Sequence, residues 1–327
     1  MIRFRDFVRV EDRYFSVVGY RHDDGVRCLL RYVPCRDGDR IDSRGRRYRK
    51  LSHREALNYF KEFQRDGIFI IPHSMIDEIY RPDERLEDVC ERDGDVRRVA
   101  EFFKLRRMGV TGSRLIGLKG KDSDIDFVAY GRYNFKLGRK KIKKGIEAGT
   151  LEKPNLKFVY RRRKVNLPFE VFKVHEERKL NKAVLNGVSF DLLYVRDYNE
   201  KPPIPEGKGK KIGHAIVTAE VKDDRFVFDY PACYFVDHPE IEAILSFTHT
   251  FVGQAFNGEV VEAYGVVEEI DGRYYLIVGT LRECNEYIVS KTLLDLSNLE
   301  YEFERWKAKT FKCSSKPSLK DSKLEVD

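Results

Sequence analysis

The sequence lacks long apolar runs, paired cysteines and internal repeats, and each absence excludes a class of protein. No stretch approaches the roughly 18 apolar residues that a membrane-spanning helix needs, so we expect no membrane contact. The first residues mix charged and apolar side chains, which predicts no secretory signal and a cytoplasmic location. The six cysteines are scattered and form no Cys-x-x-Cys pair, as is typical of reduced thiols in the cytosol.

The composition is that of a soluble globular protein, but its charge is unevenly distributed. With 327 residues, 42% hydrophobic and 35% charged, the chain is long enough for two or three domains. Residues 133–182 hold 16 Lys or Arg against 5 acids, whereas residues 212–300 hold 5 against 16. The basic segment suits a phosphate-rich partner such as RNA, with Phe158 and Tyr160 as stacking faces. A solvated basic helix face is the alternative interpretation.

One short pattern carries the strongest chemical signal. A turn at Gly112-Ser113 is followed, ten residues after the serine, by the apolar segment that begins Asp124-Ile125-Asp126. Alternation along a strand puts Asp124 and Asp126 on one face and Ile125 on the other. Two carboxylates beside a Gly-Ser turn suit a divalent metal that holds a triphosphate. A solvated strand edge and an ordinary turn are the alternative interpretations of the two halves.

This pattern resembles the signature of a known superfamily. Gly112-Ser113-Arg114, Gly117 and Asp122-Ser123-Asp124-Ile125-Asp126 look like the motif of the DNA polymerase beta-like nucleotidyltransferases. The superfamily also requires a third carboxylate on a later strand, for which Asp191, within the apolar run 187–195, is the candidate. The motif resemblance covers roughly residues 105–197. More loosely, the whole chain resembles an uncharacterised group of archaeal predicted nucleotidyltransferases.

The resemblance implies roles for named residues. It implies Mg²⁺, with Mn²⁺ as an alternative, as the cofactor, and an NTP, expected to be ATP, as the nucleotide donor. Asp124, Asp126 and Asp191 are then the catalytic and metal-binding residues. The predicted nucleotide-binding residues are Gly112, Ser113, Arg114, Lys121, Arg178 and Lys179.

The expected fold class is α+β. A nucleotidyltransferase-type mixed sheet with helices is expected at 86–200, between an N-terminal β-rich α/β domain at 1–85 and a linker at 201–211. A β-barrel-like domain of OB type is expected at 212–300, and a partly disordered tail at 301–327. Patterns predict helices at 52–65, 86–108, 136–148 and 168–182, the first with a capping box at Ser52 and Glu55. Strands are predicted at 7–10, 14–20, 26–33, 215–221, 225–229, 259–267 and 274–279.

These patterns predict a metal-dependent nucleotidyltransferase that moves a nucleoside monophosphate onto a hydroxyl. The motif does not identify the acceptor, although RNA along 133–182 is one candidate. Two alternatives stay open at this stage: a non-catalytic RNA-binding or regulatory protein on the same fold, and a protein adenylyltransferase. The sequence does not indicate the oligomeric state.

Overall fold

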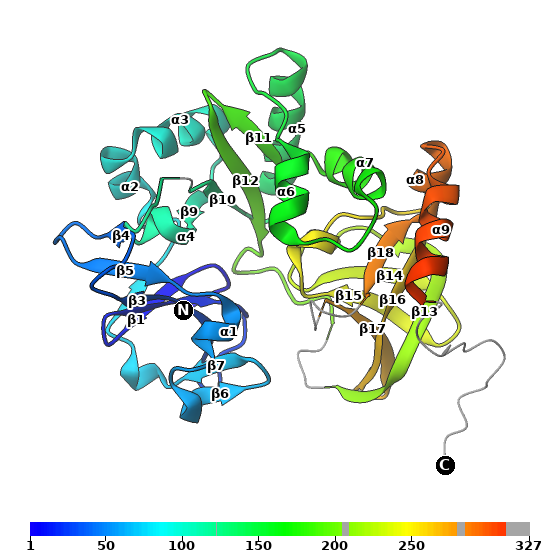
Figure 1. Cartoon of the computed structure of the whole chain (residues 1–327), viewed down its shortest axis with the longest axis horizontal. Coiled ribbons are helices and arrows are strands. Elements are labelled where there is room, and N and C mark those ends of the chain that lie inside the picture. Colours follow the sequence, from blue (N-terminus) through cyan, green and yellow to red (C-terminus); the bar gives the residue numbers. More distant parts are fainter. Residues whose placement is uncertain (122, 205–208, 280–284, 312–327) are drawn as a thin grey trace. The chain divides into compact units, whose positions relative to one another are not determined.

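The computed structural model describes residues 1–121, 123–204, 209–279 and 285–311 (Figure 1). The chain forms two compact units, one built from residues 1–154 and 181–200 and the other from 155–180 and 201–327. The expected five-part division is finer than this and stays a prediction. One difference is visible: residues 155–180, expected in the catalytic core, group with the second unit. No helix of the described residues has both the length and the apolar character needed to cross a bilayer.

The first unit opens with an eight-stranded sheet that packs around Val8, Phe15 and Phe69. The strand order is β4-β5-β3-β2-β1-β8, and β7 pairs with β3 and with β6. The strands are β1 (Phe7–Val10), β2 (Arg13–Val17), β3 (Val26–Pro34), β4 (Arg40–Ile41), β5 (Arg47–Lys50), β6 (Gln64–Arg65), β7 (Ile68–Ile71) and β8 (Glu78–Tyr80).

The helix predicted at 52–65 is much shorter in the structure. Its capping box is confirmed, because the Ser52 side chain accepts from the Glu55 N–H and the Glu55 carboxylate accepts from the Ser52 N–H. The helix α1 (His53–Ala56) ends after four residues, and only the 3₁₀ turns η1 (Lys61–Phe63) and η2 (His73–Met75) follow. Phe60 has a φ of 46°, a left-handed conformation that an α-helix cannot contain, so the predicted length is wrong.

A second, four-stranded sheet of the same unit carries the motif residues. Its order is β11-β12-β10-β9, with β10 parallel to β12 and the other pairs antiparallel. Asn186 and Gly187 join β11 to β12 with φ values of 51° and 78°, as expected for an Asn-Gly hairpin turn. The strands are β9 (Met108–Thr111), β10 (Ile125–Tyr130), β11 (Lys182–Leu185) and β12 (Val188–Val195).

Helices cover the apolar face of this sheet (Figure 1). Phe103 of α3 stacks on Phe127 with ring centroids 5.2 Å apart and meets Phe190 edge-on. The predicted helix at 86–108 is two helices, because Asp93 ends the first and caps the second by accepting from the Asp95 and Val96 backbone. The helices of this unit are α2 (Leu86–Arg92), α3 (Gly94–Phe103), α4 (Gly112–Leu115) and α5 (Arg132–Glu147).

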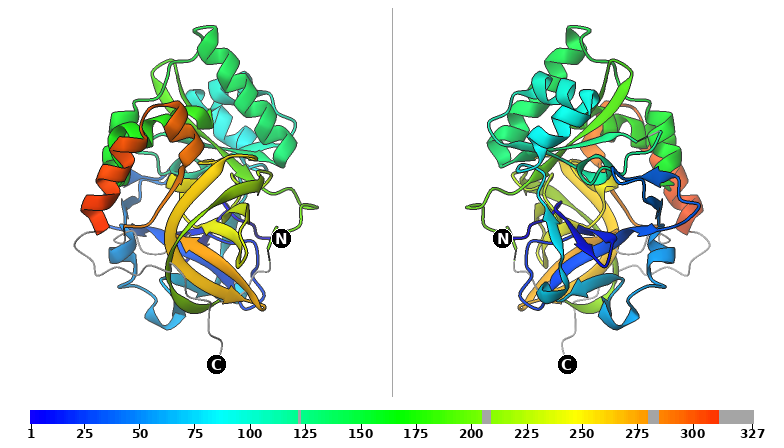
Figure 2. Two further views of the ribbon diagram at one scale, coloured as in Figure 1. Left: turned by 90° about the vertical axis from the view of Figure 1, so that its right-hand side faces the viewer. Right: turned by 90° about the vertical axis from the view of Figure 1, so that its left-hand side faces the viewer.

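The second unit is a barrel with helices. β13 pairs with both β14 and β16, which closes the order β13-β14-β15-β17-β16 into a ring, with β15 parallel to β17 and β18 added beside β16. Figure 2 shows these strands curling around a common axis, with α9 beside them. The elements are α6 (Leu156–Arg163), α7 (Phe169–Lys179), β13 (Lys210–Asp223), β14 (Ala232–Asp237), β15 (Ile241–Ser246), η3 (His249–Phe251), β16 (Val260–Ile270), β17 (Arg273–Val278), β18 (Tyr287–Ser290), α8 (Lys291–Leu296) and α9 (Glu300–Phe311).

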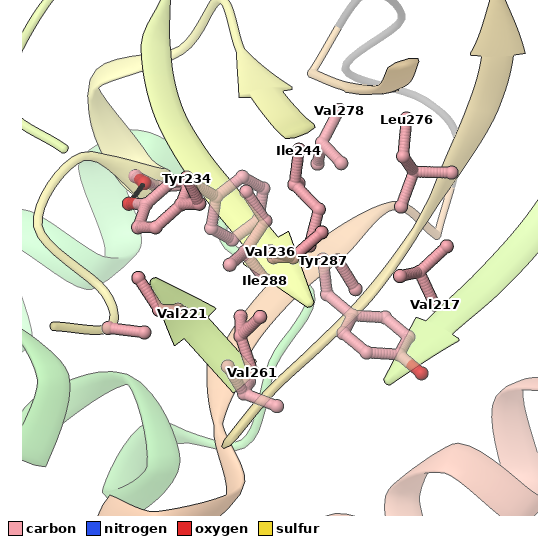
Figure 3. Packing of buried hydrophobic residues seen from close by; sticks show 14 of the residues in the cluster. Val217, Val221, Tyr234, Val236, Ile244, Val261, Leu276, Val278, Tyr287 and Ile288 are labelled. Atoms are coloured by element: carbon pink, nitrogen blue, oxygen red, sulfur yellow. Dashed lines mark hydrogen bonds between the residues drawn. The ribbon is translucent and has the colours of Figure 1, made fainter. Parts of the chain in front are cut away.

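The barrel interior is filled by aliphatic and tyrosine side chains, including Tyr234, Leu276 and Tyr287 (Figure 3). One local prediction is wrong here, because residues 225–229 form no strand, and the first part of the predicted tail belongs to α9. Phe303 of α9 meets the Tyr287 ring edge-on at 5.4 Å, which is why this charged segment is helical and docked. The rest of the predicted tail, 312–327, and residues 205–208 of the predicted linker lie outside the described residues.

Candidate active site

The four strands of the second sheet bring polar side chains into one row. Thr111 on β9 is the register partner of Asp126 on β10, and Asp126 is the partner of Asp191 on β12. Asp191 is in turn the partner of Lys182 on β11. Directly paired residues project from the same face of a sheet, so a hydroxyl, two carboxylates and an ammonium lie side by side. This face is opposite to the one that Phe127 and Phe190 present to α3.

Asp124 adds a third carboxylate to the row. It lies just before β10 and two residues before Asp126, so alternation directs it to the same side. The pKa of Asp126 is raised to about 6, chiefly by burial and then by the negative charges of Asp124 and Asp191. Opposing cations, Arg5 and Lys182, pull this pKa down. The charges of Asp124 and Asp191 act on Asp126, so the three carboxylates lie close enough to share a single site.

The Gly112-Ser113 turn closes directly over this carboxylate row. Gly112 has a φ of 74°, and a Cβ built on it would lie 2.7 Å from Asp126 Oδ2. Only glycine therefore lets the backbone pass so close to the carboxylate without strain. The Ser113 hydroxyl donates to Ser123 Oγ over 3.3 Å. Asp122, part of the sequence motif, lies outside the described residues.

The N-terminal sheet borders the site with residues that the sequence interpretation missed. The Arg5 carbonyl accepts from Thr111 Oγ1 over 2.6 Å, and Arg5 has a φ of 79°, a strained conformation for a residue with a side chain. Tyr32, buried on β3, shares a hydrogen bond with Ser113, and its pKa is raised, chiefly by burial. A buried cluster that includes Tyr32 and Leu115 packs this sheet against the motif turn.

Arg40 of the N-terminal sheet fastens the loop between the two halves of the motif. Its Nη1 donates to Ser123 Oγ over 2.9 Å, and the Gly120 N–H donates to the same oxygen over 2.9 Å. A Cβ on Gly120 would collide with the Arg40 guanidinium, so the two groups lie in close contact. The loop is therefore held by an arginine about 80 residues earlier in the chain.

Arg114, for which nucleotide contact is predicted, forms a buried ion pair with Asp93 in the structure. Its side chain is buried, and Nη1 donates to both carboxylate oxygens of Asp93 at 3.0 and 2.8 Å. Nη2 donates to the Ser123 carbonyl over 2.9 Å. Lys119 also pairs with Asp93, at 3.0 Å, whereas Lys121 is exposed on the same loop. The geometry thus leaves Lys121, and not Arg114, accessible to a phosphate.

Arg178 and Lys179, also predicted nucleotide-binding residues, belong to the second unit. Arg178 pairs with Glu259 and lies over the Phe256 ring at 4.4 Å. Lys179 is 1% exposed, pairs with Glu176 and donates to the Thr250 carbonyl over 2.9 Å. These contacts hold the end of α7 against the barrel. The row of Asp124, Asp126 and Asp191 belongs to the first unit.

The chemistry of the donor set fits a hard divalent cation. Carboxylate oxygens are the ligands that Mg²⁺ and Mn²⁺ prefer, and burial followed by the charges of Asp124 and Asp191 raises the pKa of Asp126. In the present arrangement, however, the described residues include no group of three His, Cys, Asp or Glu side chains spaced as a metal site. Lys182 forms an ion pair with Asp191 Oδ2 in this arrangement.

Comparisons with known proteins agree with this geometry. The profile of the "Nucleotidyltransferase domain" family matches residues 96–181, a range that contains the Gly-Ser turn, Asp124 and Asp126. The chain therefore carries a nucleotidyltransferase domain, and the predicted resemblance is confirmed.

An archaeal relative matches nearly the whole chain. "Uncharacterized protein MJ1086" of Methanocaldococcus jannaschii is 32% identical over 343 residues, which cover 89% of this chain and 99% of the relative. The chain belongs to the same family as this relative. No solved structure matches the chain.

Proposed function

We propose that this protein is a metal-dependent nucleotidyltransferase that moves a nucleoside monophosphate, with ATP as the expected donor, onto an acceptor hydroxyl. The observation that carries the proposal is the register that makes Asp126 and Asp191 direct neighbours, with Asp124 close enough to raise the Asp126 pKa. Asp191 lies beyond the matched profile, so its arrival in the row is an independent observation.

The proposed reaction forms one bond and breaks one. The acceptor oxygen attacks the α-phosphorus, the bond from that phosphorus to the bridging oxygen breaks, and pyrophosphate leaves with the electron pair. Mg²⁺ held by Asp124, Asp126 and Asp191 would supply charge neutralisation for the phosphates. Asp191 is the carboxylate proposed to receive the hydroxyl proton. The Gly112 backbone and the Ser113 hydroxyl would orient the terminal phosphates.

RNA is the acceptor class that we propose, because two helices present basic and aromatic side chains. On α6, Phe158 is 58% exposed, and Arg161 and Arg162 are exposed three and four residues later, on the same helix face. On α5 of the first unit, Tyr133 is 80% exposed. Exposed rings beside guanidinium groups suit stacking bases and phosphates. Tyr160 does not contribute, because its hydroxyl donates to the Leu167 carbonyl and its ring packs on Phe172.

A transfer assay tests the proposal. The purified chain is incubated with each NTP labelled at the α-phosphate, with Mg²⁺ or Mn²⁺, and with RNA or protein acceptors. Label should enter RNA, and Asp124→Ala with Asp126→Ala should abolish it. Asp37→Asn, a change at an exposed turn of the first unit, is the matched control and should keep full activity.

The alternatives correspond to other outcomes of the same assay. Label that enters protein and not RNA would identify a protein adenylyltransferase. RNA binding that falls steeply with salt but ignores NTP and metal, with no transfer, would identify a non-catalytic RNA-binding protein. Label transfer that survives the double aspartate change would refute the assigned site.

A further inference from the structure

Lys182 occupies an unusual position for a lysine. It is the register partner of Asp191 across the β11–β12 hairpin, and its ammonium forms an ion pair with Asp191 Oδ2. The Lys182 side chain is only 8% exposed, and that of Asp191 is 23% exposed. Burying an ammonium costs free energy unless a carboxylate compensates its charge, so the Lys182–Asp191 ion pair is a structural part of the row.

The pair conflicts with the role proposed for Asp191. A metal bound to the Asp191 carboxylate would lie beside the Lys182 ammonium, and the two positive charges would repel each other at a largely buried position. Lysine has a flexible four-carbon stem, so its ammonium can leave the carboxylate without any change in the sheet.

We propose that Lys182 is a positioning residue. Its ammonium pairs with the Asp191 carboxylate in the metal-free site, and this pair couples metal binding to nucleotide binding. This inference rests on the proposed function. A divalent cation bound at Asp191 displaces the Lys182 ammonium, which then lacks a counter-charge on a largely buried face. The phosphates of a nucleotide bound at the same face supply that counter-charge. Metal and nucleotide therefore bind cooperatively, and neither binds tightly alone.

Replacement of Lys182 by an uncharged residue should therefore let a metal bind at Asp191 without a nucleotide. In Lys182→Met no ammonium has to leave Asp191, so the metal binds without help from the nucleotide. In Lys182→Arg a cation remains opposite Asp191, and the coupling persists. If Lys182 only stabilised the hairpin, Lys182→Met would lower stability in every condition and leave the coupling between metal and nucleotide unchanged.

Mn²⁺ binding to the full-length chain measures the difference directly. The dissociation constant is determined by electron paramagnetic resonance, with and without an ATP analogue whose α,β-bridge is methylene and cannot be cleaved. Free analogue also binds Mn²⁺, so its own constant is subtracted in a protein-free titration. Lys61→Met, at an exposed position of the 3₁₀ turn η1, is the matched control for loss of one positive charge.

The native chain and Lys61→Met should bind Mn²⁺ at least about tenfold more tightly with the analogue than without it, as expected for two coupled ligands. Lys182→Met should bind Mn²⁺ about tenfold more tightly than the native chain when no nucleotide is present, and the analogue should add little. If Lys182→Met does not fold, Lys182→Gln provides the same comparison.

Equal or weaker Mn²⁺ binding by the folded Lys182 variant, with the analogue effect intact, would overturn the inference. The proposed function would survive that result if the native chain still transferred label. Conversely, a native chain and a Lys182 variant that neither bind Mn²⁺ nor transfer label would refute the proposed function itself. The metal titration and the transfer assay thus separate the two failures.

Discussion

Replacement of Asp126 by asparagine should stabilise the metal-free protein while it abolishes transfer. The native carboxylate is crowded by burial and by the charges of Asp124 and Asp191, which raise its pKa from 3.8 to about 6. The folded chain therefore binds this proton more tightly than the unfolded chain. The resulting penalty is complete above pH 6 and disappears as the pH falls through 6 towards 3.8.

The size of the effect follows from the shift. Roughly two pKa units, at about 1.4 kcal/mol each, give a gain in unfolding free energy of about 3 kcal/mol at pH 7.5 for Asp126→Asn. At pH 4 the folded state is almost fully protonated at this position and the unfolded state about 40% protonated, so the gain should shrink below about 1 kcal/mol. An asparagine keeps the shape of the side chain, so packing changes little.

Urea unfolding in buffer with a chelator checks this prediction at both pH values. Asp37→Asn, an exposed substitution, should change the unfolding free energy by less than about 0.5 kcal/mol. The reasoning fails if Asp126→Asn is destabilised at pH 7.5 with an unchanged dependence on urea, or if its gain does not depend on pH. A stabilised variant that still transfers label would show that the strain is real but the catalytic role is wrong.

Three further predictions concern other parts of the chain. Gly112→Ala should cost about 1–2 kcal/mol and reduce transfer at least about 100-fold, because a Cβ meets Asp126 Oδ2 at 2.7 Å on a backbone with positive φ; calorimetry and the transfer assay measure both. Arg40→Ala should raise the KM for the nucleotide about tenfold and leave the melting temperature within a few degrees, because the loop at Ser123 loses its anchor. His175 accepts from the Ser290 N–H over 2.9 Å, and burial lowers its pKa to about 4, below the unfolded value of 6.5. The stability of the second unit should therefore be complete above pH 6.5 and fall by up to about 3 kcal/mol towards pH 4, a loss that His175→Gln should remove in pH-dependent unfolding experiments.

The local parts of the site could be predicted from the sequence. Alternation alone directs Asp124 and Asp126 to one face, and the apolar pattern identifies the strand that carries Asp191. Lys182 was missed, although the signal for it exists. The Asn186-Gly187 turn fixes the hairpin register, and counting four residues back on one side and four forward on the other pairs Lys182 with Asp191.

The remaining residues of the site depend on contacts that no local pattern contains. Arg5, Tyr32 and Arg40 reach the motif because the N-terminal sheet packs on the segment after the Gly-Ser turn. The sequence motif suggests that Arg114 contacts a phosphate. In the structure Arg114 pairs with Asp93, twenty-one residues earlier, and this ion pair joins α3 to the loop. The predicted barrel is closed as expected, whereas the partners that bury Lys179 could not be read from helix periodicity.

The charges of the row explain why metal and nucleotide should depend on each other. Asp124, Asp126 and Asp191 carry three negative charges, and the cations that act on Asp126 are Arg5 and Lys182, so one negative charge is in excess. A single divalent cation reverses the sign of the site and turns it from one that repels a triphosphate into one that attracts it. If a metal displaces the Lys182 ammonium from Asp191, the buried stem of Lys182 on β11 keeps that ammonium on the same face of the sheet. Its positive charge then adds to the attraction for the triphosphate. Arg5 also lowers the pKa of Asp126, so a second positive charge acts on the row beside that of Lys182.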